Sequence, residues 1–378
     1  MKVLIVHNQY KQYGGEDTVV DQEARAYTEL GHEVRLFLKN NQQLKWADLL
    51  LSIFNFRSWK ELKGTVKDFD PDVIHVHNFI FILSPSIFWV KSKKAKIWLT
   101  LHNYRFLCPS GTLFYKNNLN LESKTFRGLM KNVARGVYQD SIFKTGVLAI
   151  IYKFNEFIGS FKKVDKFIFL TPFAQDIHLE WHPKLFANSV VKPNFLFNSP
   201  KLKKVIKDID VLFVGRFTIE KGILDVLPSL VKCCHLKIVL AGDGPVLEKA
   251  TKIIGENQHI TLLGAVNREK VYELLGRSKY LLFPSIWYEG MPMTIIEAYS
   301  AGVPVIARKL GAMETMIKHE QTGYLYSDLQ DFEKIVCELK AKDLSPLSEN
   351  AQIEFQSRYS FPIGKENLMN LMKHLYVG

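Results

Sequence analysis

Short apolar runs without polar alternation recur along the chain, and they constrain its fold more than any other feature of the sequence. The first, residues 2–7, reads as a strand buried on both faces, as is typical of a parallel sheet. Similar runs follow at intervals, with helical or loop stretches between them: residues 33–38, 72–77, 96–102 and 166–170. This alternation of strand and helix predicts an α/β fold.

A second series of such runs begins after residue 195. Its strands are predicted at residues 210–215, 236–241, 259–263, 280–283 and 303–307. Residues 201–208 between the two series are charged and poorly patterned, which is typical of a linker. At about 150 residues per domain, a chain of 378 residues accommodates two domains. We therefore expect two consecutive Rossmann-like domains, residues 1–200 and 201–362, followed by one amphipathic helix.

The positive charge of the chain is concentrated in its first half. The net charge is +12, and residues 1–195 hold 27 Lys and Arg against 17 Asp and Glu. Such a surface suits an acidic partner, whether nucleic acid, anionic lipid headgroups or a phosphorylated substrate.

The cysteines and the apolar runs indicate the compartment. The four cysteines form neither a disulfide framework nor a Cys-x-x-Cys pair, and Cys233 and Cys234 read as small apolar side chains in a helix. No apolar run reaches the roughly 20 residues that span a bilayer. The strand that starts at residue 2 leaves no room for a signal peptide. We expect a cytoplasmic protein without a transmembrane helix.

Residues 284–307 place two carboxylates at a ligand-binding position. They read as a strand end, a loop, a helix over residues 293–300 and a further strand. Glu289 lies on the loop and Glu297 about one turn into the helix. A carboxylate can accept both hydroxyls of a vicinal diol, and loops at the carboxyl ends of parallel strands bind ligands. Taken alone, two glutamates at this spacing are more typical of ordinary surface residues.

Two cations follow the first strand of the second series. Arg216 and Lys221 lie five residues apart across a loop, so both can reach one diphosphate, Arg with a planar fork and Lys with a mobile point charge. The alternative is a pair of solvated surface cations. Gly244 opens the next such loop, but the sequence around it is not a complete dinucleotide-binding motif, which disfavours NAD.

Other candidates lie at strand ends of the first series. Gly14 and Gly15 precede a predicted helix that Asp17 can cap, and paired glycines there let the backbone approach a phosphate. His77 and His102 end neighbouring strands, although a histidine at such a position can also be purely structural.

Together, Glu289-x7-Glu297 and Gly215-Arg216-x4-Lys221-Gly222 resemble the donor site of GT-B glycosyltransferases of family 4. The resemblance covers essentially the whole chain and is strongest over residues 210–326. It implies a GT-B fold, in which two Rossmann-like domains face each other across a cleft. It also implies that the last helix, residues 363–378, crosses back to the first domain.

The resemblance further implies a retaining transfer of a sugar from a nucleoside-diphosphate sugar to an acceptor hydroxyl, without cofactor or metal. The residues implied in catalysis are His102, Arg216, Lys221 and Glu289. Donor binding is implied for Gly14, Gly15, Arg216, Lys221, Gly244, Ala265, Val266, Glu289, Gly290, Met291, Met293 and Glu297. Acceptor binding is implied for His77, Asn78, Asn103 and Tyr104. Rival interpretations are a nucleotide-sugar epimerase on the same fold and a non-catalytic subunit that only binds the nucleotide sugar.

Two segments refine this expectation. The segment around Cys108 resembles a bacterial polysaccharide-synthesis subgroup of the family. Members of that subgroup often carry a Cys-x-x-Cys-like pair where this chain has Leu121-Glu122-Ser123, so a metal or disulfide role of that pair is absent.

Residues 125–163 combine apolar side chains at helical spacing with lysines. Such helices can lie on an anionic membrane or simply pack on their own domain. The basic residues of this region are Lys124, Arg127, Lys131, Arg135, Lys162 and Lys163. Membrane docking would suit a lipid-linked acceptor at the inner face of the cell membrane.

Overall fold

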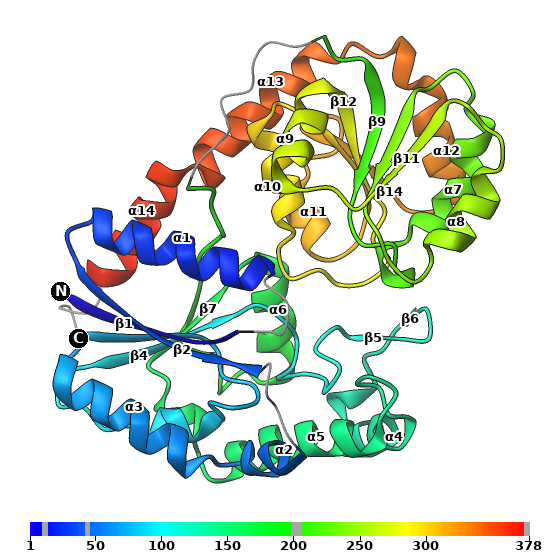
Figure 1. The fold of residues 1–378 in the computed structure, drawn as a ribbon. Coiled ribbons are helices and arrows are strands. Elements are labelled where there is room, and N and C mark those ends of the chain that lie inside the picture. The colour runs from blue at the N-terminus through cyan, green and yellow to red at the C-terminus, as the bar shows by residue number, and fades with distance from the viewer. Residues whose placement is uncertain (10–13, 42–45, 198–205, 374–378) are drawn as a thin grey trace. The chain divides into compact units, whose positions relative to one another are not determined.

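The computed structural model describes residues 1–9, 14–41, 46–197 and 206–373. Within these residues the chain forms two compact units. Unit 1 comprises Met1–Tyr115, Asn120–Phe195 and the chain from Gly364 onward, and unit 2 comprises Lys116–Leu119 and Leu196–Ile363. Each unit is built on a six-stranded sheet (Figure 1), which confirms the predicted α/β class.

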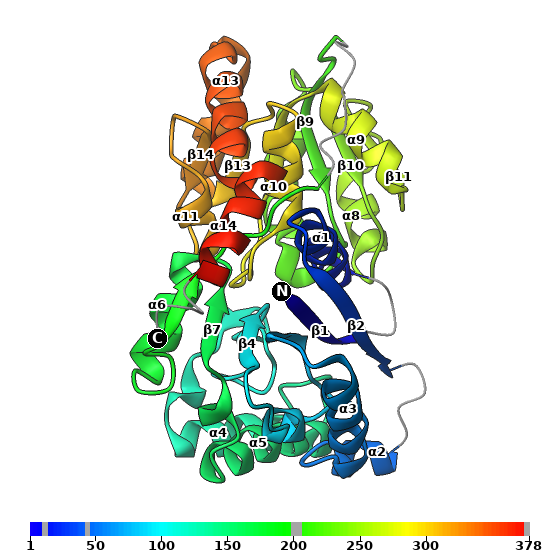
Figure 2. The same ribbon diagram turned by 90° about the vertical axis from the view of Figure 1, so that its left-hand side faces the viewer.

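The sheet of unit 1 has the order β2-β1-β3-β4-β7-β8, and all its strands are parallel. Helices cover both faces, with α1 on one side and α3 on the other (Figures 1 and 2), which explains why β1 and β3 lack exposed positions. All five strands predicted for the first series are confirmed. β8 was not predicted, because its three half-buried residues have no apolar signature. The strands of this sheet are β1 (Lys2–Gln9), β2 (Glu33–Asn40), β3 (Val73–Asn78), β4 (Lys96–Leu101), β7 (Lys166–Phe169) and β8 (Ser189–Val191). A separate two-stranded sheet pairs β5 (Phe114–Tyr115) with β6 (Asn118–Leu119), and β6 is assigned to unit 2.

The helices of unit 1 connect these strands. The predicted cap of the first helix is wrong by three residues, because α1 begins at Gly15 with Gly14 as its N-cap. Asp17 forms the half of a capping box that needs no N-cap side chain, by accepting a hydrogen bond from the Gly14 amide at 2.8 Å. The helices are α1 (Gly15–Glu29), α2 (Trp46–Leu51), α3 (Phe56–Phe69), α4 (Phe126–Arg135), α5 (Ile142–Phe157) and α6 (Pro172–Trp181).

The sheet of unit 2 has the order β11-β10-β9-β12-β13-β14 and is also parallel. The five predicted strands are confirmed with shifts of one or two residues at their ends, and β14 is an additional edge strand that the sequence analysis missed. The strands are β9 (Ile209–Val214), β10 (Ile238–Ala241), β11 (Ile260–Gly264), β12 (Ser278–Phe283), β13 (Val305–Arg308) and β14 (Gly323–Tyr326).

Helices lie on both faces of this sheet (Figure 1), and an apolar core packs between the sheet and helices α7 and α12. Helix α10 has the predicted bounds. The prediction that Cys233 and Cys234 are helical is wrong, because α7 ends at Lys232; Cys233 is buried as its C-cap, and Cys234 is exposed. The helices are α7 (Ile223–Lys232), α8 (Leu247–Ile254), α9 (Arg268–Arg277), α10 (Met293–Ser300), α11 (Ala312–Met316), α12 (Leu329–Glu338), α13 (Ser345–Glu354) and α14 (Phe361–Lys373).

Helix α14 starts earlier than predicted, at Phe361, and its later part belongs to unit 1. Gly364 packs so closely on Phe195 that a β carbon there would lie 2.3 Å from the aromatic ring, and Lys365 forms an ion pair with Glu29 at 3.2 Å. Residues 374–378 of the predicted helix and residues 201–205 of the predicted linker lie outside the described residues.

Among the residues that the structure describes, no helix is both long and apolar enough to traverse a bilayer.

Candidate active site

Two loops of unit 2 meet where the strand order of its sheet reverses. Strands β9 and β12 are neighbours at this point, and the connections from them run to opposite sides. Ligands of open α/β sheets bind outside the carboxyl ends of such strands. The loop after β9 leads into a short 3-10 turn, Ile219–Lys221, and the loop after β12 carries Glu289. The two residues predicted to act on the donor diphosphate and on the sugar therefore meet at a position suited to a ligand.

Main-chain contacts hold these two loops together. Gly222 adopts a left-handed conformation with φ of 69°, and a β carbon there would lie 2.0 Å from the carbonyl oxygen of Pro284. The amide of Ile286 also donates to the carbonyl of Glu220 at 3.0 Å. The position of Lys221 relative to the β12 loop is thus fixed by the backbone.

Lys221 and Glu289 form a largely buried ion pair. The Lys221 Nζ lies 2.7 Å from Glu289 Oε1, and the Ser285 hydroxyl donates to the same oxygen at 2.6 Å. Glu289 is 7% exposed. Burial opposes its ionisation, but the Lys221 ammonium and the Ser285 hydroxyl outweigh that effect, so the pKa of Glu289 lies below its ordinary value. The carboxylate is therefore charged and oriented.

Arg216 and Gly244 lie on the neighbouring loops. The side chain of Arg216 is 68% exposed, and its guanidinium approaches Glu220 only to 3.9 Å, so it can turn toward an anion. Gly244 has φ of 155°, and a β carbon there would lie 2.4 Å from the carbonyl of Phe217. Glycine is required at this position because the two loops themselves approach closely.

Glu297 is held by two residues that the sequence analysis missed. Arg268 Nη2 and the Tyr272 hydroxyl, both on α9, each lie 3.3 Å from Glu297 Oε1. Burial raises the pKa of Glu297, and these two partners only partly offset it. The spacing of Arg268 and Tyr272 indicates one helix face, but nothing in the sequence links that face to a helix 25 residues away.

The remaining predicted donor residues follow the same sheet edge. Gly290 and Met291 lie in the β12–α10 connection, and Met293 opens α10. Ala265 and Val266 come directly after β11, where Ala265 is exposed.

The sheet of unit 1 reverses its order between β1 and β3, and the predicted glycines and histidines lie there. Gly15 faces open space, since a β carbon there would meet nothing within 4 Å. The Gly14 amide is already bound by Asp17, whose other oxygen lies 3.0 Å from His7 Nε2. Only part of the backbone of this glycine pair is therefore available to a phosphate.

The structure brings His77 and His102 together. His77 Nδ1 lies 3.0 Å from His102 Nε2, and the two rings stack with centroids 5.3 Å apart. His77 is buried, while His102 is half-buried at the end of β4.

The other predicted acceptor residues have roles within the fold. Asn78 is buried, donates to the carbonyl of Asn8 at 2.8 Å and accepts from the amide of Ile80 at 3.0 Å. Tyr104 is 2% exposed and stacks on His178. Asn103, which is half-buried, offers more of its side chain to a ligand than either of them.

Glu23, His75 and His77 place three potential metal ligands within 4.8 Å of one another in the interior of unit 1. However, Lys192 Nζ lies 2.5 Å from Glu23 Oε1. A divalent ion would be repelled by this ammonium group. The donor set therefore suits an internal ion pair better than a metal centre.

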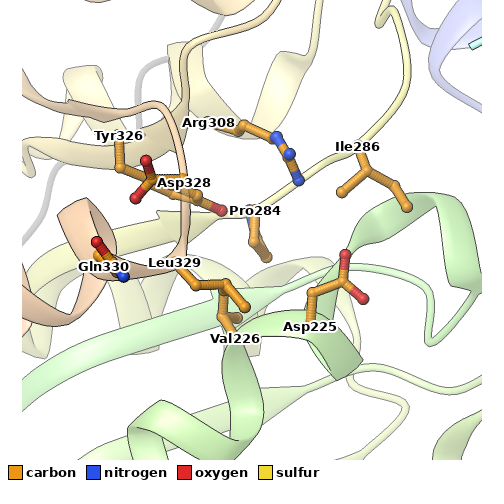
Figure 3. Close-up of a pocket in the computed structure, with 9 residues that line it drawn as sticks. All are labelled: Asp225, Val226, Pro284, Ile286, Arg308, Tyr326, Asp328, Leu329 and Gln330. Carbon is orange, nitrogen blue, oxygen red and sulfur yellow. The ribbon is translucent and has the colours of Figure 1, made fainter. Parts of the chain in front are cut away.

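Unit 2 also contains a pocket of about 620 Å³ beside α7 and α12 (Figure 3). Pro284 and Ile286 line it, so the β12 loop borders this pocket as well as the Lys221–Glu289 pair. Its other lining residues are Asp225, Val226, Arg308, Tyr326, Asp328, Leu329 and Gln330.

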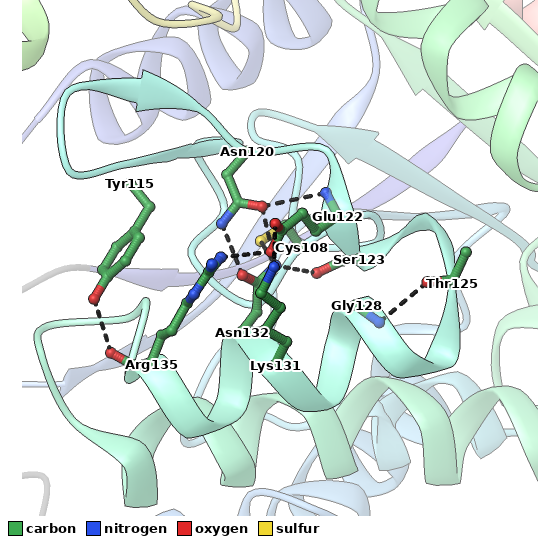
Figure 4. Close-up of polar contacts among 10 residues, drawn as sticks. All are labelled: Cys108, Tyr115, Asn120, Glu122, Ser123, Thr125, Gly128, Lys131, Asn132 and Arg135. Atoms are coloured by element: carbon green, nitrogen blue, oxygen red, sulfur yellow. Dashed lines mark hydrogen bonds and ion pairs between the residues drawn. The ribbon is translucent and has the colours of Figure 1, made fainter.

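A buried polar cluster organises the segment around Cys108 (Figure 4). Asn132 on α4 is fully buried, accepts from Asn120 Nδ2 at 2.8 Å and donates to Ser123 Oγ at 2.8 Å. Its amide also approaches the free thiol of Cys108 at 4.0 Å. Amide hydrogen bonds thus hold the segment where a cysteine pair is lacking.

On the outer side of this cluster, Glu122 pairs with two of the basic residues of the segment (Figure 4). Its carboxylate lies 2.8 Å from Lys131 Nζ and 2.5 Å from Arg135 Nη1. These two charges are therefore partly neutralised within unit 1.

Comparison with known proteins identifies the family. The family model of glycosyl transferases group 1 matches residues 195–352, and that of glycosyltransferase family 4 matches residues 13–139. An uncharacterised 41.2 kDa protein in the cps region of Klebsiella pneumoniae is 31% identical over 279 residues, which cover 70% of this chain and 67% of that protein.

Solved structures resemble the whole chain. The apo form of the lipopolysaccharide outer core galactosyltransferase WaaB superimposes with a TM-score of 0.68 at 16% identity, covering 99% of both chains. The Anabaena protein HepE in complex with UDP and glucose gives a TM-score of 0.65 at 16% identity, covering 99% of this chain and 100% of that one. At this level of identity the likeness concerns the fold, which is GT-B.

Proposed function

The chain belongs to the family 4 glycosyltransferases, and on this premise we propose that it moves a sugar from a nucleoside-diphosphate sugar to a hydroxyl of a glycan or lipid-linked acceptor, with retention of configuration. The observation that carries this proposal is the Lys221–Glu289 pair at the strand reversal of unit 2. It combines a cation for a phosphate with an ionised carboxylate for a sugar. The complexes of the Anabaena protein with UDP and with UDP-glucose support a nucleotide-sugar donor.

The proposed chemistry needs no carboxylate nucleophile and no metal. The bond between the anomeric carbon and the phosphate oxygen breaks, and the acceptor oxygen bonds to the anomeric carbon on the same face. The leaving phosphate takes the proton of the acceptor hydroxyl. Lys221 and the exposed Arg216 stabilise the negative charge that develops on that phosphate.

Assembly of a surface polysaccharide is the proposed setting. The relative from a cps region and the structural similarity to a lipopolysaccharide galactosyltransferase both support it. The acceptor is then a growing glycan or its lipid-linked precursor.

We further propose that α4 and α5 dock on an anionic membrane. Phe143, Ile150, Phe154 and Phe157 recur at 7-, 4- and 3-residue steps along one face of α5, and their exposed fractions range from 40% to 88%. Exposed aromatic and aliphatic side chains flanked by lysines are typical of interfacial helices. Lys162 and Lys163 supply that charge next to α5.

A panel of nucleotide sugars tests the catalytic proposal. The purified protein should slowly hydrolyse one donor in the absence of acceptor, releasing the nucleoside diphosphate, and Lys221→Ala should not. An epimerase would instead return an isomeric nucleotide sugar, and a binding subunit would bind the donor without releasing product. Either of these results would contradict the proposal.

A further inference from the structure

A chain of buried polar side chains leads from the interior of unit 1 to His102. Lys192 Nζ lies 2.5 Å from Glu23 Oε1, and Glu23 Oε2 lies 3.6 Å from His77 Nε2. His77 Nδ1 in turn lies 3.0 Å from His102 Nε2. The side chains of Lys192, Glu23 and His77 are at most 2% exposed. They come from β8's end, α1 and β3, so the tertiary fold assembles them.

The rings of His77 and His102 are both neutral. Burial lowers the pKa of His77 well below its ordinary value, and the neighbouring histidines and the Lys192 ammonium lower it further. Burial, His7 and Lys192 lower the pKa of His102 in the same way. A neutral imidazole carries one N–H and one acceptor nitrogen. The proton position on one ring therefore determines that on the other.

Glu23 sets the direction of these hydrogen bonds. Among the described residues, Glu23 Oε2 and His77 Nε2 are both buried atoms without a hydrogen-bond partner, and they face each other. A carboxylate can only accept, so the 3.6 Å contact, which is longer than a normal hydrogen bond, is electrostatically favourable only with a proton on His77 Nε2. A proton on Nδ1 would leave two acceptors opposed in a dry interior, which is costly.

His75 is the other ring close to Glu23, with Nδ1 3.4 Å from Oε2. It is engaged elsewhere on both nitrogens, by the Tyr27 hydroxyl at 3.1 Å and by the Thr100 hydroxyl at 2.8 Å. It does not extend the chain toward His102.

We propose that Lys192, Glu23 and His77 are positioning residues that fix His102 as the Nε2–H tautomer. The free nitrogen of His102, Nδ1, is then a hydrogen-bond acceptor and selects a ligand hydroxyl. The opposite tautomer would present a donor at the same place. This inference rests on the proposed function in one respect: the ligand hydroxyl belongs to the transferred sugar.

Glu23→Gln tests the direction of the hydrogen bonds between Glu23, His77 and His102, because it replaces an acceptor by a donor at nearly constant side-chain volume. Lys192 holds the oxygen of Gln, as it holds Oε1 of Glu23, so the Gln amide faces His77 and donates to Nε2. The His77 proton then moves to Nδ1 and is donated to His102 Nε2. His102 is left protonated on Nδ1.

Two-bond ¹H–¹⁵N spectra of protein labelled at the histidine nitrogens report these tautomers without substrate. His102 is assigned by the signals lost in His102→Gln. In the wild type, Nε2 of His102 should be a protonated, pyrrole-type nitrogen, and in Glu23→Gln it should become pyridine-type. A wild-type His102 protonated on Nδ1 overturns the proposal even if the variant does not fold, and so does an unchanged tautomer in a folded Glu23→Gln.

Activity adds a second readout. Glu23→Gln should lower kcat about tenfold, the loss expected for one misdirected hydrogen bond. His77→Asn, whose amide oxygen can replace Nδ1 as acceptor, should retain more activity than His77→Leu. The control is His178→Asn: His178 is equally buried but bonds the carbonyl of Ala174, so its loss should affect stability alone.

The outcomes separate this inference from the proposed function. Correct tautomers in a protein that transfers no sugar would contradict the proposed function and leave the hydrogen-bond chain intact. Sugar transfer by a protein with the opposite His102 tautomer would contradict this inference and leave the proposed function intact. Stoichiometric zinc in the purified protein, lost in Glu23→Gln, would replace the hydrogen-bond chain by a metal centre.

Discussion

The Lys221 ammonium lies 2.7 Å from Oε1 of Glu289, so the charge that sequence patterns assign to the donor diphosphate is paired with the carboxylate that they assign to the sugar. A diphosphate must share this lysine with Glu289 or draw it away. Substitution of either residue therefore changes the electrostatics of the other, and each prediction at this site has to include both.

Lys221→Ala should lower turnover by about two orders of magnitude or more, because one preorganised charge contributes roughly 3–4 kcal/mol to a transition state. The substitution also leaves Glu289 buried without its counter-charge. Steady-state kinetics measures the loss. Lys252→Ala is the matched control, since its ion pair with Glu248 is exposed and it should keep wild-type activity.

Arg216→Lys should also impair transfer, because the planar fork of the guanidinium is lost. EDTA should leave wild-type activity intact if these two cations do the work of a metal. Near-normal transfer by Arg216→Lys would remove Arg216 from the mechanism, and inhibition by EDTA would contradict metal independence.

Glu289→Gln and Glu297→Gln should separate sugar transfer from nucleotide binding. Glu297→Gln weakens the expected hold on the ribose, so its affinity for the free nucleoside diphosphate should fall. Glu289→Gln should keep that affinity, because it frees Lys221 for the phosphates, while transfer falls. Isothermal calorimetry compares the two. Equal losses of affinity would show that the assigned roles are wrong.

The same two variants should shift thermal stability in opposite directions. The raised pKa of Glu297 means that its ionisation opposes folding, so stability is lost as pH rises from about 4.5 through the folded pKa. Glu297→Gln should therefore raise Tm at neutral pH and have little effect below pH 4.5. The lowered pKa of Glu289 contributes stability above its ordinary value of 4.5, and that contribution is lost as pH falls through the folded pKa. Glu289→Gln should lower Tm at neutral pH. Scanning calorimetry across this range checks both signs.

Asn132→Ala should destabilise unit 1 by about 1–3 kcal/mol, because the buried Asn120 Nδ2 loses its Asn132 acceptor and the half-buried Ser123 hydroxyl loses the donor that Asn132 supplies. Asn118→Ala is the control, since that side chain is exposed and donates only to the nearby carbonyl of Lys116. Denaturant unfolding compares the two variants. Equal stability of both would mean that the cluster in Figure 4 does not hold the segment.

Vesicle sedimentation should show binding that rises with anionic lipid and falls with salt, since each basic residue near an anionic leaflet contributes roughly 1 kcal/mol. Glu122 already pairs with Lys131 and Arg135, so the apolar face of α5 is the sharper target. Phe154→Glu with Phe157→Glu should abolish binding. Ile353→Glu, an exposed position on α13, should not. A wild-type protein that ignores anionic vesicles at low salt would contradict membrane docking.

Strand positions could be predicted because buried parallel strands have a compositional signature. The run at residues 2–7 and the unit 2 strands carry it, whereas β8 consists of three half-buried residues and offers no pattern to detect. The wrong prediction of Asp17 instead of Gly14 as the N-cap of α1 has a similar cause, because a glycine N-cap has no side chain that could indicate its role.

Pairwise contacts across the fold could not be predicted. Glu289 and Lys221 were each identified from local motifs, but their ion pair depends on the adjacency of β9 and β12. The contact of Arg268 and Tyr272 with Glu297 depends on how α9 lies beside α10. Likewise, the pattern at His77 gave no reason to expect a carboxylate from α1 behind it, because Glu23 reads as one more polar residue of an amphipathic helix.

The contact between Gly222 and the Pro284 carbonyl limits how donor preference can be redesigned. Because the Pro284 carbonyl leaves no room for a side chain at position 222, library clones that replace Gly222 should no longer assemble the site. Diversity is better directed at Ala265 and Val266, which follow β11 outside that contact. Substitutions at these two positions should change the donor preference without disturbing the catalytic geometry, so a selection can act on the two properties separately.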